Sequence, residues 1–268
     1  MKISVITPTN NSEKTILNNV ESVTNQTYHN FEHIIIDNLS TDNTLNLIRK
    51  EYEQKQLSSN LKVISEKDAG ISDAFNKGIA MASGGVIGIL NSDDYFYNNL
   101  VFEKVVKEFN SNEILFVHGN IFFEDKIYGS NVRKPLLCPI QTAMPYNHPT
   151  MFFRKDVYKK YGMFDTSYKY AMDFEFICRL EKQISNFRQR GIYIEGEPLS
   201  VMNAGGESWQ NEIPGIKEVK RSLIQHGLWN HNARVEYSKR MVRTKFKRIL
   251  NILNLNMIIK FWRKHKWR

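Results

Sequence analysis

The sequence has only two cysteines, Cys138 and Cys178, and they form no CxxC pair. A disulfide scaffold and a cysteine-based zinc site are therefore not expected, and a reducing compartment is the simplest setting. Neither GxGxxG nor GxxxxGK(S/T) occurs, which disfavours dinucleotide enzymes and P-loop NTPases. No uninterrupted apolar stretch reaches the ~20 residues of a membrane span, and the run Ile3–Ile6 is too short for a signal peptide. These absences predict a cytosolic protein.

The chain is long enough for one large domain, or for one domain with an extension, at 268 residues. Its 41% hydrophobic and 24% charged residues are ordinary for a soluble globular protein and exclude global disorder. Apolar, β-branched runs alternate with stretches of helical periodicity in the first part of the chain. The predicted strands are Lys2–Thr7, Phe31–Ile36, Leu61–Ser65 and Val86–Leu90. Helices are predicted after Ser12 as N-cap, after Thr41 or Asp42 as N-cap, and over Ile71–Met81.

This alternation predicts an α/β fold with a mostly parallel sheet covered by helices on both faces. Farther along the chain we predict a strand at Ile114–Val117 and helices at Leu100–Phe109, Asp156–Tyr161 and Met172–Leu180, separated by irregular sequence. The change of rhythm suggests two halves: residues 1–97 look like a nucleotide-binding half, and residues 98–215 look like a second half that closes over it. Residues 216–268 form a helical, basic C-terminal extension.

The net charge of +9 is concentrated near the C-terminus. Between Arg234 and Arg268 twelve lysines and arginines stand against one acidic residue, so the remainder is close to neutral. One stripe of a helix would carry Val242, Phe246, Ile249, Leu250, Leu253 and Met257, and Trp262 and Trp267 follow among basic residues. A basic amphipathic helix favours an anionic membrane surface as partner of residues 235–268, ahead of a helix packed on the body. No base-reading motif is present, so nucleic acid is not an expected partner.

Polar clusters follow the predicted strands, at Thr7-Pro8, at Asp37 and at Asp93-Asp94. In parallel sheets ligands bind outside the carboxyl ends of the strands. Two adjacent carboxylates repel each other unless a cation or a proton lies between them, and oxygen ligands suit Mg²⁺ or Mn²⁺. The alternative is that the aspartates only form a turn or cap a helix. Their place at a strand end favours a metal that offsets the charge of a nucleoside diphosphate.

Several segments together resemble family 2 glycosyltransferases of the GT-A fold. The segments ISVITPTNN, IIIDNLSTDNT and SEKDAGISDAFNKGIAMASGGVIGILNSDDYF resemble the N-terminal half of that family. The last of them is similar to the branch that builds bacterial O-antigen, capsule and exopolysaccharide units. NHPTMFFRKDVYKKYGMFD and YAMDFEFICRL resemble its acceptor-side signature. The resemblance covers about residues 2–209 and implies a GT-A, Rossmann-like sheet flanked by helices.

The resemblance also implies roles on the donor side. Asp37 matches an aspartate that contacts uracil, and Asp93, with Asp94 after it, matches the DxD motif that binds Mn²⁺ or Mg²⁺. Asn91 replaces the first acidic residue of that motif, and Asn38 replaces a second acidic residue beside Asp37. The full set of donor-side positions is Thr7, Pro8, Asn10, Asp37, Lys67, Asp68, Asp73, Asn76, Lys77, Ser92 and Asp93.

On the acceptor side the resemblance implies that Asp173 is the catalytic base. The acceptor-side candidates are His148, Arg179 and Trp209, and His148 could equally satisfy a loop carbonyl. The expected reaction is an inverting transfer of a hexose from a UDP-sugar to a lipid-linked oligosaccharide, by an enzyme peripheral on the inner face of the cell membrane. The alternatives are a catalytically inactive, sugar-nucleotide-binding scaffold, a nucleotidyltransferase and a retaining transferase.

Overall fold

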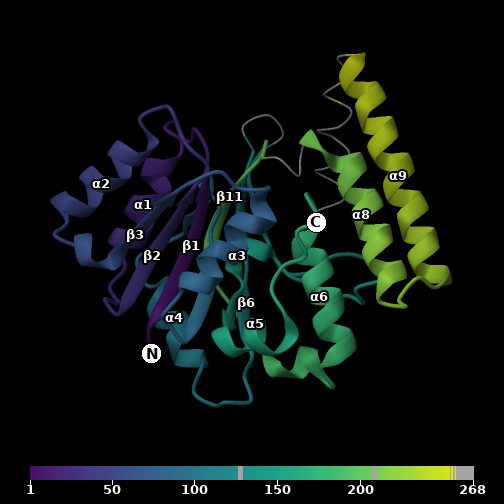
Figure 1. Ribbon diagram of the computed structural model, residues 1–268. Helices are drawn as coiled ribbons and strands as arrows, with labels where there is room; N and C mark the ends of the chain where they lie inside the picture. The colour runs from purple at the N-terminus through teal and green to yellow at the C-terminus, as the bar shows by residue number, and fades with distance from the viewer. Residues whose placement is uncertain (126–128, 207–209, 254, 256, 258–268) are drawn as a thin grey trace.

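A seven-stranded, mostly parallel sheet forms the centre of the molecule (Figure 1). The computed structural model describes residues 1–125, 129–206, 210–253, 255 and 257. The strand order is β10-β6-β9-β4-β1-β2-β3, and β9 is antiparallel to both of its neighbours. The strands are β1 (Ile3–Thr9), β2 (Phe31–Asp37), β3 (Leu61–Ser65), β4 (Val86–Ile89), β6 (Phe116–Gly119), β9 (Phe152–Arg154) and β10 (Gly191–Ile194).

Helices cover both faces of this sheet because successive strand residues point to opposite sides. Ile34 and Ile36 pack on one face under α3 (Ile71–Met81), α5 (Lys155–Tyr161) and α6 (Met172–Gln183). Ile35 packs on the other face, under α1 (Ile16–Thr24) and α2 (Thr44–Gln54). Helix α4 (Val101–Glu108) covers that second face at β1 and β4. The α/β prediction with a mostly parallel sheet is therefore confirmed.

A smaller sheet lies beside the central one, with the strand order β5-β11-β7-β8. Its strands are β5 (Tyr95–Phe96), β11 (Ser200–Asn203), β7 (Ile121–Glu124) and β8 (Asn131–Arg133), and short 3-10 turns lie at Ser58–Asn60, His148–Thr150 and Phe187–Arg190. The sequence predicted irregular structure where β7 and β8 occur, because strands this short carry little periodicity. Strand β11 is the part of this sheet that contacts the candidate site, because its last residue, Asn203, bonds the turn that follows β4.

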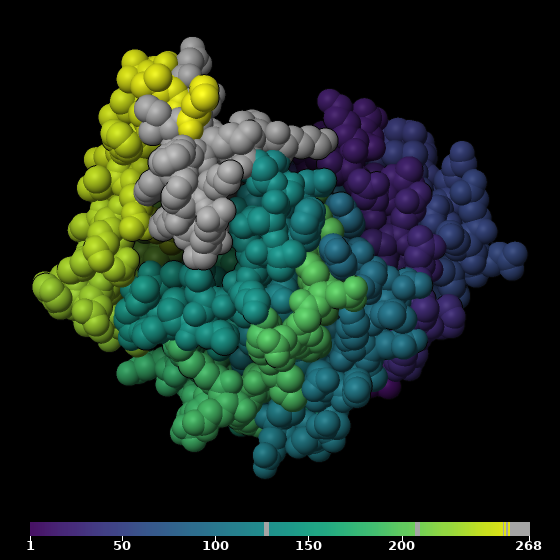
Figure 2. All heavy atoms as spheres, turned by 180° about the vertical axis from the view of Figure 1, so that it is seen from behind, coloured from purple at the N-terminus to yellow at the C-terminus, as the bar shows by residue number. Residues whose placement is uncertain are grey.

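The C-terminal part forms two helices, α8 (Glu212–Gln225) and α9 (His231–Ile252), side by side at the edge of the molecule opposite α2 (Figures 1 and 2). Helix α8 packs against α6, and Leu223 joins the main core. The apolar stripe predicted for α9 faces outward: Val242, Phe246 and Ile249 are 66%, 56% and 52% exposed, whereas Leu250 is 8% exposed. Among the described helices, none combines the length and the apolar character that crossing a bilayer requires.

The predicted element boundaries are correct within a few residues, but the predicted helix caps are wrong. Helix α1 begins at Ile16 with Thr15 at its N-cap position, and no side chain caps it. The Ser12 hydroxyl instead lies 2.9 Å from the Ser92 hydroxyl, in a hydrogen bond across the sheet edge. Helix α2 begins at Thr44, and Asp42 accepts a hydrogen bond from the Thr44 amide. Ser12 thus bonds the turn after β4, whereas Asp42 bonds the first amide of α2 from the position before the N-cap.

Glu32 is a buried carboxylate near the N-terminal end of β2, the end away from Asp37. It forms ion pairs with Lys62 at 2.8 Å and Lys2 at 3.1 Å, and it accepts hydrogen bonds from Ser4 and from the amide of Ser83. Burial by itself raises the pKa of Glu32, but the hydrogen bonds from these four residues outweigh it and hold the pKa well below its usual range. One carboxylate therefore ties together β1, β2, β3 and the start of β4.

We expect E32Q to lower the free energy of unfolding by about 2 kcal/mol at pH 7, because it removes charge-assisted hydrogen bonds. The depressed pKa means that this contribution is present above about 4.5, the usual value, and is lost as the pH falls below it. Urea denaturation at pH 7 and at lower pH measures both effects. The control E236Q removes an exposed pair with Lys239 and should change stability much less. An equal difference between wild type and E32Q at all pH values would contradict the assignment.

Candidate active site

The carboxyl ends of β1 to β4 meet at one edge of the sheet. The parallel register sets Thr9 opposite Asp37 and Asp37 opposite Ser65, while Ile6 pairs with Ile89 near the end of β4. The Thr9 hydroxyl is buried at this edge and has no hydrogen-bond partner among the described residues. Polar groups from three crossovers therefore reach one rim, which is where ligands bind in sheets of this kind.

The turn that follows β4, from Asn91 to Asp94, is held from two directions. The Asn19 amide group in α1 donates to the carbonyl oxygens of Asn91 at 2.8 Å and Asp94 at 3.0 Å. From β11, the Asn203 side chain donates to the Asp93 carbonyl oxygen, and the Asn203 backbone N–H donates to Asp94 Oδ1. The turn is thus fixed through its backbone, which leaves the Asp93 carboxylate available for a ligand.

Asp93 and Asp94 differ in their surroundings. Asp94 is 2% exposed and its carboxylate accepts from Asn203 and Asn91. Burial and the charge of Asp93 raise the pKa of Asp94 well above its usual value, and burial also raises the pKa of Asp93. Both shifts show that negative charge here lacks compensation from the protein. A cation at Asp93 would supply it.

The residues present fit a divalent metal held by few protein ligands. Besides the Asp93 carboxylate, the buried Oδ1 of Asn91 has no hydrogen-bond partner in the described part of the chain. No group of three or more His, Cys, Asp or Glu side chains within that part could hold a metal alone. Mg²⁺ and Mn²⁺ accept such a sparse set, because they retain waters and bind substrate phosphates. The oxygen-only chemistry agrees with those ions.

Of the donor-side positions near β1 and β2, some lie buried within the strands and one lies in the loop beyond β1. Thr7 and Pro8 lie buried within β1, and the Thr7 hydroxyl is 2.9 Å from His33 Nε2, whose pKa burial lowers to about 3. Asn10 lies beyond the strand and donates to the Asn38 carbonyl oxygen at 2.6 Å. Asp37 is fully buried and accepts hydrogen bonds from the amide and the hydroxyl of Ser40 and from the hydroxyl of Ser65.

The positions around α3 form a second group. Lys77 bridges Glu66 at 2.8 Å and Asp73 at 3.3 Å, and it donates to the Lys67 carbonyl oxygen. The Asp68 amide donates to Asn38 Oδ1, which joins this group to the loop after β2. Asn76 bonds both backbone groups of Phe164, so it connects α3 to the loop that precedes α6. These contacts organise the rim without filling it.

Asp173 lies in the first turn of α6, where the helix dipole favours a negative charge. Its Oδ1 accepts from the Phe174 amide at 2.7 Å. Asp173 and His148 line one small cavity of about 10 Å³ together with Ile89, the last residue of β4. Asp173 therefore lies beside the strand that leads to Asp93. The ring of His148 stacks on Phe75, and burial lowers the pKa of His148 while the charge of Asp173 opposes this.

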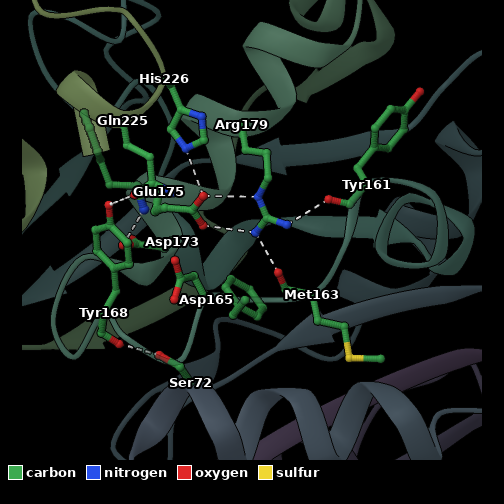
Figure 3. A network of polar contacts seen from close by, with 12 residues as sticks. Ser72, Tyr161, Met163, Asp165, Tyr168, Asp173, Glu175, Arg179, Gln225 and His226 are labelled. Atoms are coloured by element: carbon green, nitrogen blue, oxygen red, sulfur yellow. Dashed lines mark hydrogen bonds and ion pairs between the residues drawn. The ribbon is translucent and has the colours of Figure 1, made fainter. Parts of the chain in front are cut away.

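Arg179 lies in an internal network (Figure 3). Its guanidinium donates to both oxygens of Glu175, at 3.1 and 3.0 Å, and to the carbonyl oxygens of Tyr161 and Met163. The structure thus joins Arg179 to the protein rather than directing it at the acceptor. Trp209, the third acceptor-side candidate, lies outside the described residues.

Sequence reasoning missed the residues that hold the site. Asn19 carried a signal, because it is a polar residue on the apolar face that α1 forms with Ile16, Val20 and Val23. Asn203 carried none, since its partners Asp93 and Asp94 lie in a distant segment, whereas Glu175 precedes Arg179 by four residues, the spacing of a helical ion pair. Local patterns identified the rim, whereas the contacts that fix it come from the tertiary structure.

Comparison with known proteins gives a consistent picture. The family model for glycosyl transferase family 2 matches residues 4–179. An uncharacterized glycosyltransferase of Haemophilus influenzae is 32% identical over 249 residues, which covers 84% of this chain and 74% of that protein. WfgD of Escherichia coli, a UDP-Glc:alpha-D-GlcNAc-diphosphoundecaprenol beta-1,3-glucosyltransferase, is 34% identical over 120 residues, or 44% of this chain and 45% of that protein.

Several relatives are longer than this chain. The chondroitin synthase of Pasteurella multocida is 28% identical over a match that covers 91% of this chain but only 26% of that protein. Among solved structures, the mannosyltransferase PcManGT of Pyrobaculum calidifontis, in complex with GDP-Man and Mn²⁺, superimposes with a TM-score of 0.65 at 14% identity. That match covers 98% of this chain and 81% of that structure. At this identity the match shows the shared fold.

We expect R179K to lower the free energy of unfolding by about 2 kcal/mol, because lysine cannot keep the two-oxygen contact with Glu175 and both carbonyl contacts. UDP affinity should stay unchanged, since the Arg179 guanidinium is engaged by Glu175 and by two carbonyl oxygens inside the protein. Urea denaturation and calorimetric titration with UDP measure the two quantities. The control R188K, at the more exposed pair with Glu181, should have a smaller effect. Unchanged stability with weakened ligand binding would instead support a ligand contact.

Proposed function

Because the chain belongs to glycosyl transferase family 2 and is a glycosyltransferase, we propose that it transfers a hexose from a UDP-sugar, with inversion, to a hydroxyl of a lipid-linked oligosaccharide. The observation that carries this proposal is the convergence of two carboxylates on one edge. Asp93 follows β4, and Asp173 lines a cavity with Ile89 at the end of the same strand. One carboxylate serves the leaving group and the other serves the nucleophile.

The donor lies along the carboxyl edge, with its uracil at the loop after β2. Asp37 and the loop residues Asn10, Lys67 and Asp68 shape this end, and Asp73, Asn76 and Lys77 line the approach to the sugar diphosphate. The Thr9 hydroxyl offers an unpaired polar group beside them. The preference for UDP, as UDP-glucose, UDP-galactose or an N-acetyl form, is supported by the name of WfgD, which gives UDP-Glc as donor.

The diphosphate lies at the turn after β4. Asp93 would hold Mn²⁺ or Mg²⁺ there, with Ser92 beside it, and the ion would offset the charge that builds on the departing nucleoside diphosphate. Asp94, a second metal candidate from the sequence, acts in support, because its oxygens accept from Asn203 and Asn91 inside the protein. The Mn²⁺ in PcManGT supports a metal on this fold.

Asp173 acts as the base. As the acceptor oxygen attacks the anomeric carbon, the proton of its hydroxyl passes to the Asp173 carboxylate and the bond to the diphosphate breaks. General-base help of this kind contributes about 10²–10⁴ in rate. A single displacement inverts the anomeric centre, so an α-linked donor gives a β-glycoside. Burial lowers the pKa of His148, so a neutral ring lies on the acceptor side of the base.

The acceptor reaches the site from a membrane surface. Along α9, apolar side chains that would normally be buried face outward, and Arg243, Lys245 and Arg248 lie exposed among them. This pattern is typical of a helix that lies in the interface of an anionic bilayer. The diphosphoundecaprenol acceptor in the name of WfgD supports a lipid-linked substrate of bacterial surface polysaccharide synthesis. The enzyme would work at the inner face of the cell membrane.

We expect one UDP-hexose to bind more tightly with Mn²⁺ than without it, and D93N to lose at least about tenfold of that metal-dependent affinity. Calorimetric titration with UDP-, GDP- and dTDP-sugars measures this, and D156N, an exposed aspartate on α5, is the matched control. Binding of no nucleotide sugar by the wild type would overturn the proposal. Metal-dependent binding without hydrolysis or transfer would favour the inactive scaffold.

Replacement of the exposed stripe tests the membrane surface. We expect the double variant F246S and I249S to weaken binding to phosphatidylglycerol vesicles by at least about tenfold, because each buried apolar side chain contributes about 1.5–3 kcal/mol. Vesicle co-sedimentation measures it, and salt should weaken the remaining binding. The control replaces two exposed leucines elsewhere, L17S and L100S. Equal vesicle binding by the α9 variant and the wild type would contradict the anchor.

A further inference from the structure

The region that family 2 shares with this chain ends at Arg179, yet helix α8, beyond that limit, holds the segment that carries Asp173. Residues 165–171 form the loop that enters α6. The side chains from other segments that hydrogen-bond this loop include Glu218, Arg221 and Gln225 of α8 and Ser72 of α3. The base of the reaction therefore depends on a helix outside the matched region.

Glu218 of α8 makes the most direct contact with this loop. Its Oε1 accepts from the Lys169 amide at 2.9 Å, and its Oε2 accepts from the amides of Tyr170 and Ala171 at 2.8 and 2.9 Å. Ala171 occupies the N-cap position of α6, and no side chain of its own caps the helix. A carboxylate from another helix thus binds consecutive amide groups at a helix start, where a negative charge is favoured.

Two further side chains of α8, Arg221 and Gln225, contact the same loop. The Arg221 guanidinium lies 4.0 Å from the centre of the Tyr168 ring and donates to the Ser167 carbonyl oxygen. Gln225 accepts from the Tyr168 hydroxyl at 2.8 Å, and Ser72 of α3 donates to the Tyr168 carbonyl oxygen at 2.7 Å (Figure 3). Tyr168 is buried between the two helices.

The far end of α8 contacts α6 beyond Asp173. His226 Nε2 lies within hydrogen-bond distance of Glu175 Oε1, at 3.0 Å, while Arg179 binds both oxygens of the same carboxylate (Figure 3). Glu175 is 1% exposed. Asp173 stands between Ala171 and Glu175 in sequence, so the α8 region binds the backbone before Asp173 and the carboxylate side chain of Glu175 after it.

We propose that Glu218 is a positioning residue for the transfer reaction, which sets the place of Asp173 through the amides of residues 169–171. The inference rests on the proposed role of Asp173 as base. Without the hydrogen bonds from Glu218 the first turn of α6 can move. A displacement of about 1 Å at a reacting group costs about 10² in rate. Donor binding depends on the other side of the rim and stays intact.

The test compares E218Q with the wild type, because glutamine keeps the shape but places an amide N–H₂ against backbone donors. We expect kcat to fall about 10- to 100-fold, with the KM for UDP-glucose and the affinity for UDP unchanged. The assay follows transfer from UDP-glucose to a synthetic lipid-diphosphate-linked N-acetylglucosamine, and slow hydrolysis of UDP-glucose by water. E53Q, an exposed glutamate on α2, is the control. If E218Q unfolds at the assay temperature, E218D, one methylene shorter, replaces it with the same expected loss.

Hydrogen exchange gives a readout that does not need activity. The amides of Lys169, Tyr170 and Ala171 should exchange at least about tenfold faster in E218Q, while the rest of α6 stays protected. An unchanged kcat, unchanged exchange, or a kcat loss accompanied by equal loss of UDP affinity would each overturn the inference. If the wild type neither transfers nor hydrolyses any UDP-sugar, the proposed function fails. In that case the exchange of these three amides alone decides whether Glu218 holds the loop.

Discussion

The register of β1 with its parallel neighbours decides where every candidate ligand contact lies. Because Thr9 is opposite Asp37 and Ile6 is opposite Ile89, the residues that follow β1, β2 and β4 meet at one edge. A shift of one residue would turn each side chain of the shifted strand to the other face of the sheet. Both faces of the central strands are buried, so apolar packing alone does not specify the register, and the ion pairs of the buried Glu32 with two lysines help to fix it at the opposite end.

Each side of the site pairs one carboxylate that is bound within the protein with one that is left for chemistry. Asp94 accepts from Asn203 and holds the turn next to Asp93, the proposed contact of the diphosphate. Glu175 accepts from Arg179 and His226 and holds α6 next to Asp173, the proposed base for the acceptor hydroxyl. Pre-organisation of this kind matters because reacting groups must already lie in place when the substrates bind. The cost is a buried carboxylate on each side: Arg179 and His226 contact that of Glu175, whereas burial and the charge of Asp93 raise the pKa of Asp94.

Much of the fold and of the rim could be predicted from the sequence, since strand patterns and the segments around Asp93 and Asp173 are local signals. The rest could not. Glu218 bonds a loop far from it in sequence, and nothing in α8 distinguishes it from a solvated helical glutamate. The amphipathic pattern of α9 predicted an apolar stripe, but the direction in which it faces depends on packing, which buries Leu250 and exposes Phe246. The predicted cap at Ser12 failed because its hydroxyl bonds Ser92 in the turn after β4, and Asp42 lies one residue before the N-cap position although it bonds the first amide of α2.

Two measurements test most directly whether Asp173 is the base of an inverting transfer: the anomeric configuration of the product, and the rate at which a variant of Asp173 forms it. Proton NMR of the glycoside formed from an α-linked UDP-hexose should show a β-anomer. D173N should form it about 10²–10⁴ times more slowly while it binds UDP as the wild type does. An α-anomer, or a D173N variant with unchanged kcat, would contradict the assignment of Asp173 and the arrangement of the two carboxylates around the sugar.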